Sequence, residues 1–401
     1  MISRLVAITF IFGCTSVAWM ILGGTILQRT HASDERLRDH VESIWGSPQV
    51  QSGLTAQYDF TGVARQIRPS SANLVVDLNS EPRKKGLLWY STYKVRLRGE
   101  YVFHNPEQEK KLVRVSLRFP AAQAVYDGLQ LTIDGLQAAP YSDKASAWIL
   151  ADAAPDATFT VRVSYESQGL QSWKYSFGES VNPIENFHLR MNTNFRAVDF
   201  PDNTLAPTGK RETRDGWQLD WSYKSLLSGY QIAMQMPEKL QPGPLASDIS
   251  FFAPVSLFFF FFVIFIITTL RNIELHPMNY FFIAAAFFAF HLLIAYLADH
   301  LDIHVTFLIS SAVSVFLVVS YLRLVPGVDV VVREAAIAQA IYLVLFSYAF
   351  FFEGLTGLSI TIGAILTLFV VMQMTARIKW SEKFRSEAIA STRGFADSPL
   401  A

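Results

Sequence analysis

The chain has 401 residues, of which 51% are hydrophobic and only 17% are charged. Its 34 Lys and Arg residues balance its 34 Asp and Glu residues, which excludes the strong basic field of a nucleic-acid-binding protein. The single cysteine, Cys14, excludes an intrachain disulfide and a cysteine-rich metal centre. A charged fraction well below the ~25% of soluble domains indicates a membrane protein.

Six uncharged hydrophobic runs predict six transmembrane helices. They cover residues 5–27, 251–270, 280–298, 303–322, 335–352 and 355–376. Each is long enough to cross ~30 Å of hydrocarbon at ~1.5 Å rise per residue. No convincing small-residue cleavage site follows the first run, so we interpret it as an uncleaved anchor rather than a signal peptide.

Basic residues at the ends of the predicted spans predict the orientation of the chain. Those expected on the inner side are Arg4, Arg271, Arg323, Arg333, Arg377, Lys379, Lys383 and Arg385. The short loops expected outside, 299–302 and 353–354, contain no Lys or Arg. Because positive residues favour the cytoplasmic side, both termini are expected in the cytoplasm. The long segment after the first span is then outside, which in a bacterium is the periplasm.

This long segment, residues 28–250, begins with a helical pattern and continues with strands. Asp34 is a plausible helix N-cap and Gly46 a plausible stop. Beyond them the hydrophobic period changes to two, in 93–98, 112–119, 159–165, 187–191, 217–221 and 230–234. Turn signals at 105–106, 134–135 and 215–216 separate such strands.

The predicted fold class is therefore a six-helix transmembrane bundle plus a periplasmic all-β, sandwich-like domain whose strands are antiparallel. Five parts follow along the chain. They are an anchor (1–27), a juxtamembrane helix and linker (28–57), the β-rich domain (58–250), a five-helix bundle (251–376) and a basic cytoplasmic tail (377–401). Residues 237–244, which contain three prolines, are interpreted as the linker back to the membrane.

Two motifs, one before and one after the predicted β-rich strands, are distinctive. One is Trp-Gly-Ser-Pro-Gln at 45–49 with Ser-Gly at 52–53, and the other is Leu-His-Pro-Met-Asn-Tyr at 275–280. The second leads into an aromatic-rich span that ends in Leu-Ala-Asp-His at 297–300. In these motifs, and in the order of anchor, β domain, bundle and basic tail, the chain resembles the CreD family of bacterial inner-membrane proteins. The resemblance implies a role in envelope integrity or envelope stress, linked to a two-component regulon and colicin tolerance, without established enzymatic activity.

Candidate polar sites lie in and beside the third predicted span. His291 near its middle could belong to a conduction path, although hydrogen bonds to Ser310, Ser311, Ser314 or Gln339 would make it structural instead. Asp299, His300, Asp302 and His304 fall within six residues and could relay protons or hold a metal. The alternative is a solvated turn in which Asp302 caps the next helix, and we expect no metal or cofactor.

Phosphate-loop, dinucleotide, zincin and serine-hydrolase motifs are all absent from the sequence, and we expect a protein that is not an enzyme. Two function classes remain. The first is an envelope protein whose β domain binds a protein, peptidoglycan or lipid partner, while the bundle is embedded in the bilayer. The second is a transporter or channel gated by the β domain. Candidate partner contacts, each of which core packing would also explain, are Trp89, Tyr90, Tyr93, Trp148 and Trp173.

Overall fold

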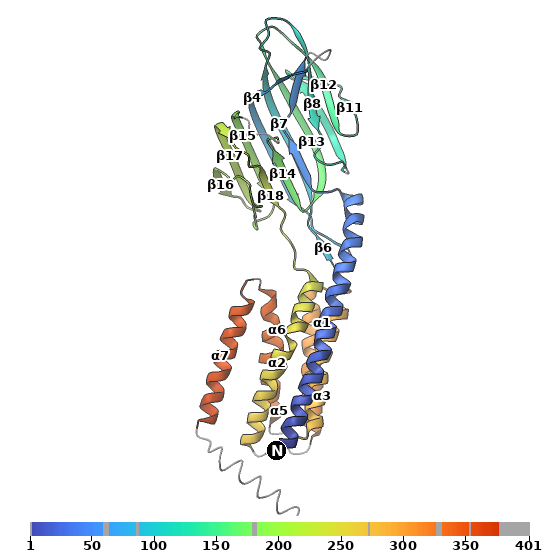
Figure 1. Ribbon diagram of the computed structural model, residues 1–401, viewed down its shortest axis with the longest axis vertical. Coiled ribbons are helices and arrows are strands. Elements are labelled where there is room, and N and C mark those ends of the chain that lie inside the picture. Colours follow the sequence, from blue (N-terminus) through green and yellow to red (C-terminus); the bar gives the residue numbers. More distant parts are fainter. Residues whose placement is uncertain are drawn as a thin grey trace, which may run out of the picture. The chain divides into compact units, whose positions relative to one another are not determined.

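The computed structural model describes residues 2–58, 64–85, 88–122, 124–178, 183–271, 273–325, 331–352 and 354–376. The chain divides into two compact units, Asp34–Lys239 and a second one formed by Met1–Ser33 with Leu240–Ala401. Strands build the first unit and helices the second (Figure 1). Six helices are long and apolar enough to cross a membrane, so the predicted combination of a six-helix transmembrane bundle and a β-rich domain is confirmed.

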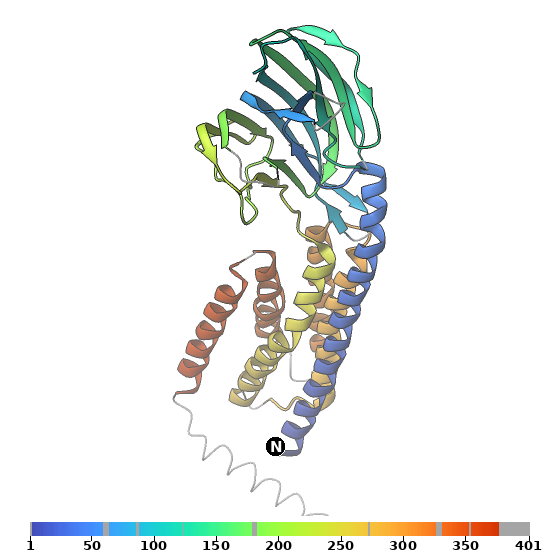
Figure 2. The same ribbon diagram turned by 45° about the horizontal axis from the view of Figure 1, so that its top comes forward.

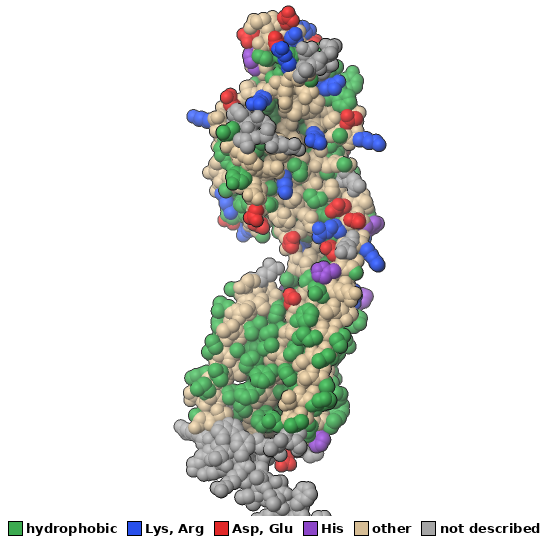
Figure 3. Space-filling model, viewed as in Figure 1, with side chains coloured by type: hydrophobic (Ala, Val, Ile, Leu, Met, Phe, Trp, Pro, Cys, Tyr) green, Lys and Arg blue, Asp and Glu red, His purple; other side chains and the backbone are tan. Residues whose placement is uncertain are grey.

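The helical unit contains the six candidate spans. Four helices are regular: α1 (Ile2–Trp45), α2 (Pro242–Leu270), α3 (Pro277–Leu297) and α4 (Ile303–Leu324). The fifth span, Val332–Phe351, joins α5 (Val332–Gln339), a π-helical turn (Ala340–Leu345), α6 (Phe346–Tyr348) and a 3₁₀ turn (Ala349–Phe351). The last helix is α7 (Thr356–Thr375). Figure 3 shows hydrophobic side chains spread over the face of this unit that is in view, as a lipid-facing surface requires.

Two predicted boundaries in and beside this unit need correction. The helix α1 continues without a break to Trp45, so Asp34 is not an N-cap; its carboxylate pairs with Arg38 instead, at 3.2 Å. Gly46 does end the helix, with φ of 117°, a conformation that favours glycine. Residues 242–250 were assigned to the β-rich domain but form the start of α2, because Pro242 is compatible with the first turn of a helix.

The β unit contains a large and a smaller sheet. In spatial order, the eight-stranded sheet contains β10 (Leu136–Ala138), β9 (Tyr126–Ile133), β13 (Thr158–Leu170), β7 (Thr92–His104), β4 (Pro69–Ser80), β15 (Pro183–Thr193), β17 (Trp217–Leu227) and β16 (Gly209–Glu212). The five-stranded sheet contains β11 (Tyr141–Ser142), β12 (Ser146–Ala153), β8 (Lys111–Arg118), β2 (Thr55–Tyr58) and β3 (Arg65–Ile67). Figure 2 shows both sheets, whose buried residues form one hydrophobic cluster.

Two small sheets complete the β unit. One contains β1 (Gln49–Ser52), β14 (Ser172–Ser176) and β18 (Ile232–Gln235), and the other is the hairpin of β5 (Arg83–Lys85) and β6 (Leu88–Tyr90). The pairs β1–β14 and β4–β15 are parallel, which corrects the expectation of a purely antiparallel sandwich. Parallel pairing needs a long crossover. Here the paired strands are separated by about a hundred residues, so local turn signals in the sequence do not indicate that they pair.

Predicted turns are confirmed by the strand pairing. Asp134 and Gly135 connect β9 to β10 with φ of 49° and 83°, as a two-residue hairpin turn of type I′ requires. Asp215 and Gly216 lie in the turn between β16 and β17. Asn105 follows β7, and its side-chain amide donates to the carbonyl oxygen of Ala154 at 2.8 Å.

Candidate functional site

His291 lies inside the helical unit, on α3. Its Nδ1 donates to the carbonyl oxygen of Phe287 at 2.9 Å, because a carbonyl can only accept. The ring packs edge-on against Trp19 of α1, with centroids 5.4 Å apart. Within the described part of the chain, His291 Nε2 and Trp19 Nε1 have no hydrogen-bond partner. A buried acceptor and a buried donor are thus left unsatisfied beside this ring contact.

The polar partners predicted for His291 bond elsewhere. Ser314 Oγ donates to the carbonyl oxygen of Ala286 at 2.7 Å and accepts from Gln339 Nε2 at 2.9 Å. Ser311 Oγ donates to its own helix, and Ser310 Oγ has no partner among the described residues. The Ser314–Gln339 bond connects α4 to the fifth span immediately before its π-helical turn. The Ser314 bonds therefore hold α4 against α3 and the fifth span, and none of these side chains is hydrogen-bonded to His291.

The turn from Asp299 to His304 separates its polar groups. Asp302 Oδ1 accepts from the backbone N–H of His304 at 2.9 Å, which confirms its role as the N-cap of α4. Asp299 pairs at 3.5 Å with Arg29 of α1, a partner that the sequence analysis missed. The His304 ring packs on Phe351 instead, at 5.1 Å between centroids. Among the described residues no group of three or more His, Cys, Asp or Glu could hold a metal ion.

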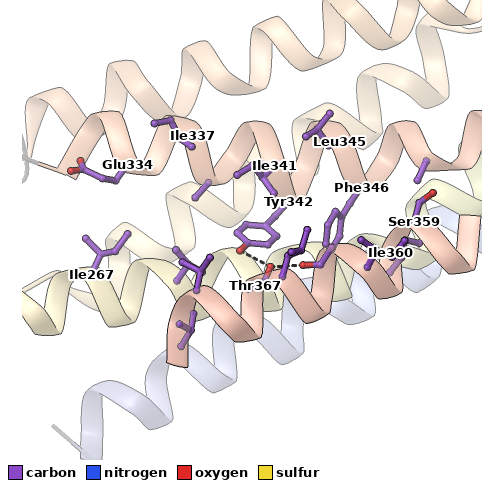
Figure 4. A pocket seen from close by; sticks show the side chains of 18 residues that line it. Ile267, Glu334, Ile337, Ile341, Tyr342, Leu345, Phe346, Ser359, Ile360 and Thr367 are labelled. Atoms are coloured by element: carbon purple, nitrogen blue, oxygen red, sulfur yellow. Dashed lines mark hydrogen bonds between the residues drawn. The ribbon is translucent and has the colours of Figure 1, made fainter. Parts of the chain in front are cut away.

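An apolar pocket of about 670 Å³ lies between α2, the fifth span and α7 (Figure 4). Aliphatic side chains line most of it. Its polar contacts are a hydrogen bond from Tyr342 to Thr367 Oγ1 at 2.9 Å and one from Thr367 to the carbonyl oxygen of Gly363 at 2.7 Å. Glu334 at its edge is already paired with Arg271. This lining suits an apolar group and offers no acid–base pair.

The five aromatic residues proposed as partner contacts differ in exposure. Tyr90, Tyr93 and Trp173 are buried, and the last two are fully inaccessible, so these three belong to the interior of the β unit. The sequence could not separate them from contact residues because period-two patterns do not say which face is covered. Trp89 and Trp148 remain half-buried.

Trp148 belongs to an apolar patch on the outer face of the five-stranded sheet. The patch, called here the outer patch, consists of Leu112, Tyr141, Trp148 and Leu150. Tyr141 stacks on Trp148 with centroids 6.1 Å apart, and the guanidinium of Arg114 lies 5.4 Å from the Trp148 ring. Tyr141 is 59% exposed, Leu112 49% and Leu150 40%. Such a group of exposed apolar residues on a sheet face is typical of a protein contact surface.

The motif at residues 45–53 contributes to a group of buried polar side chains in the β unit, called here the seam, which consists of Gln49, Gln51, Tyr165 and Ser167. Gln49 Nε2 donates to Ser167 Oγ at 2.8 Å, and Gln51 Oε1 accepts from the Tyr165 hydroxyl at 2.5 Å. Both glutamines are essentially inaccessible. Burial raises the pKa of Tyr165 well above its usual value, so its hydroxyl stays protonated and donates. The seam anchors β1 to β13, and this role is structural.

The motif at residues 275–280 is also structural. The His276 side chain is the N-cap of α3 and accepts from the backbone N–H of Met278 at 3.2 Å, and Pro277 starts the helix. Asn279 Oδ1 accepts from the hydroxyl of Tyr321 on α4 at 2.7 Å. Both motifs thus specify how the two units are built, not a reaction.

Six apolar helices combined with a large β-sheet unit define a polytopic membrane protein with an extensive domain outside the hydrocarbon. The family described as inner membrane protein CreD matches residues 1–381, and the chain belongs to that family. The resemblance noted in the sequence is confirmed, and so is the inner membrane as location. No curated protein matches the chain.

Two solved structures show weak likenesses. A putative nutrient binding protein from Legionella pneumophila is 10% identical, with a TM-score of 0.34 over 54% of this chain and 76% of that chain. An M1 zinc metallopeptidase from Deinococcus radiodurans is 11% identical, with a TM-score of 0.30 over 43% of each chain. Neither likeness bears on function.

Proposed function

We propose that this inner-membrane protein acts without catalysis, as an envelope protein whose β unit binds a protein partner through the outer patch. Both termini are then cytoplasmic, the β unit is periplasmic, and the helical unit is the membrane platform. The observation that carries the proposal is the stacked Tyr141–Trp148 pair, flanked by exposed Leu112 and Leu150. Support for the family role in envelope integrity or stress comes from membership of the CreD family.

Photocrosslinking in native membranes tests the outer patch. A photoreactive aromatic residue in place of Tyr141 should give an adduct with one envelope protein. The matched control is the same residue in place of Tyr230, which is 53% exposed and lies outside the patch. Tyr141→Ser with Leu150→Ser should reduce partner retention at least about tenfold, since aromatic anchors dominate binding energy. Equal adducts from both positions, or adducts with peptidoglycan alone, would contradict binding of a protein partner at the patch.

A transporter or channel is the second candidate function. It is favoured by buried polar atoms in the helical unit that have no partner among the described residues, namely His291 Nε2, Thr306 Oγ1 and Ser310 Oγ. The π-helical turn after Gln339 adds to it, because such turns are frequent at functional sites. His291 nevertheless forms no hydrogen bond or ion pair with a carboxylate among the described residues.

His291→Leu separates the two candidates. Under the envelope-protein proposal the variant should keep partner binding unchanged and lose about 1 kcal/mol of stability or less, because among the described residues His291 is hydrogen-bonded only to its own helix. Ion and proton flux across proteoliposomes, with His276→Leu as control, is the measurement. Flux that is present in wild type and lost in a folded His291→Leu variant would instead establish conduction.

A further inference from the structure

The hairpin of β5 and β6 presents three basic side chains. Arg83 and Lys84 are exposed and Lys85 is half-buried. Tyr90 and Leu88 point inward and pack with Val41 of α1 in a small hydrophobic cluster of their own. The hairpin is therefore a fixed element of the β unit, and its charges are held on a defined scaffold.

These charges are not neutralised within the unit. No ion pair among the described residues involves Arg83, Lys84 or Lys85, whose only recorded charge contact is the Arg83 guanidinium over the Trp45 ring, 3.5 Å from its centroid. The carboxylates that flank the hairpin are used elsewhere, Asp34 by Arg38 at 3.2 Å and Glu81 by Lys94 at 3.0 Å. Three cations thus remain available to an anion.

Chain connectivity limits how far the hairpin can lie from the lipid headgroups. The Tyr90 hydroxyl lies 3.4 Å from Asp34 Oδ1, and Asp34 follows Leu27, the end of the apolar run, by seven residues of α1, about 10 Å along a helix. The Nζ atom of Lys239 lies 4.1 Å from the centroid of the Trp89 ring, and Lys239 precedes the start of α2 by three residues. The headgroup layer extends roughly 5–8 Å beyond the hydrocarbon. The remaining gap is short enough for the long side chains of arginine and lysine to reach across it.

We propose that Arg83, Lys84, Lys85 and Trp89 form a binding site for the phosphate of anionic phospholipid headgroups. A guanidinium binds phosphate oxygens bidentately, and lysines add point charges. Tryptophan is enriched at the membrane interface, where its ring is half in apolar surroundings. Each basic residue near an anionic surface strengthens association about fivefold, so three together contribute about a hundredfold.

The test uses the full-length protein in nanodiscs made of phosphatidylcholine alone or mixed equally with phosphatidylglycerol. Hydrogen exchange of the backbone amides of β5 and β6 should be slowed by phosphatidylglycerol in wild type, and high salt should remove the effect. The triple variant Arg83→Gln, Lys84→Gln, Lys85→Gln should exchange equally in both lipids. The matched control removes three exposed charges elsewhere on the same unit, with Lys144→Gln, Arg211→Gln and Arg214→Gln, and should behave as wild type.

Two results would overturn the proposal. Equal protection of the β5 and β6 amides in neutral and anionic nanodiscs would show that the hairpin does not recognise anionic headgroups and contacts the interface only through its tryptophan. A photoreactive residue in place of Lys84 should form adducts with phospholipid in native membranes, and an adduct with a protein instead would make the hairpin a protein contact. Neither result bears on protein binding at the outer patch, which is tested separately by crosslinking at Tyr141.

Discussion

Replacing Gly216 with alanine should destabilise the β unit by at least about 3 kcal/mol. A Cβ atom at this position would lie 2.1 Å from the carbonyl oxygen of Thr193 and 2.8 Å from the backbone nitrogen of Phe195. Both are backbone atoms, one at the end of β15 and one just after it, so no side-chain rotation relieves the clash. The Thr193 hydroxyl also accepts from the backbone N–H of Trp217 at 3.0 Å, which ties the same segments together.

The matched control is Gly209→Ala in the same hairpin. There a Cβ would meet only the Cβ of Asp220, at an ordinary 3.7 Å, and stability should change by less than about 1 kcal/mol. Urea unfolding of the detergent-solubilised protein, followed by tryptophan fluorescence, gives both values. A Gly216→Ala variant as stable as Gly209→Ala would show that Thr193 and Phe195 do not cover the turn as described.

Replacing Gln51 with leucine should cost about 2 kcal/mol of unfolding free energy. The buried Tyr165 hydroxyl would lose its acceptor, 2.5 Å away, in a place that water does not reach. Tyr165→Phe should cost a similar amount because it leaves Gln51 Oε1 unpaired. The double variant Gln51→Leu, Tyr165→Phe should then be more stable than the sum of the single changes predicts, and additive losses would mean that the two groups do not interact.

The same seam sets a pH dependence on the alkaline side. Burial raises the pKa of Tyr165 above its ordinary 10.0, so the folded state binds the phenolic proton more tightly than the unfolded state. The resulting stability is fully present below pH ~10 and is lost as the pH rises above that value. Tyr165→Phe should weaken this loss, and a pH series of urea unfolding from neutral to alkaline solution measures it.

Much of the architecture could be predicted because it depends on local patterns. Apolar runs long enough for a bilayer and alternating strands each leave a signal within a few residues, and so do turns such as Asp134-Gly135. Asp302 was also recognisable as an N-cap, since it lies in the short polar break between two apolar runs and directly precedes the second. The last four spans were accordingly placed within a few residues of their observed ends, and four of the eight strands of the large sheet (β7, β13, β15 and β17) were located, although each is longer than its predicted core.

What escaped prediction depends on contacts between distant segments. The parallel pairs β1–β14 and β4–β15, the ion pair of Arg29 with Asp299 and the burial of Tyr93 and Trp173 all require knowledge of the fold. The continuity of α1 past Asp34 was missed because an acidic residue before an apolar pattern looks the same inside a helix as at its start. The π-helical turn likewise has no sequence signature.

The three-stranded sheet has a consequence for biogenesis. It pairs β14 with β1, the first strand of the β unit, and with β18, the last one. From Gln49 to Gln235 the ribosome must add 186 residues, which takes roughly 10–40 s at about 5–20 residues per second. The edge of β14 that later pairs with β18 stays unpaired while the chain from Ser176 to Gln235 is added, and such edges favour aggregation. In the proposed topology, with the β unit in the periplasm, the nascent domain can close only as α2 follows it into the translocation machinery, so export and completion of this fold would be coupled in time.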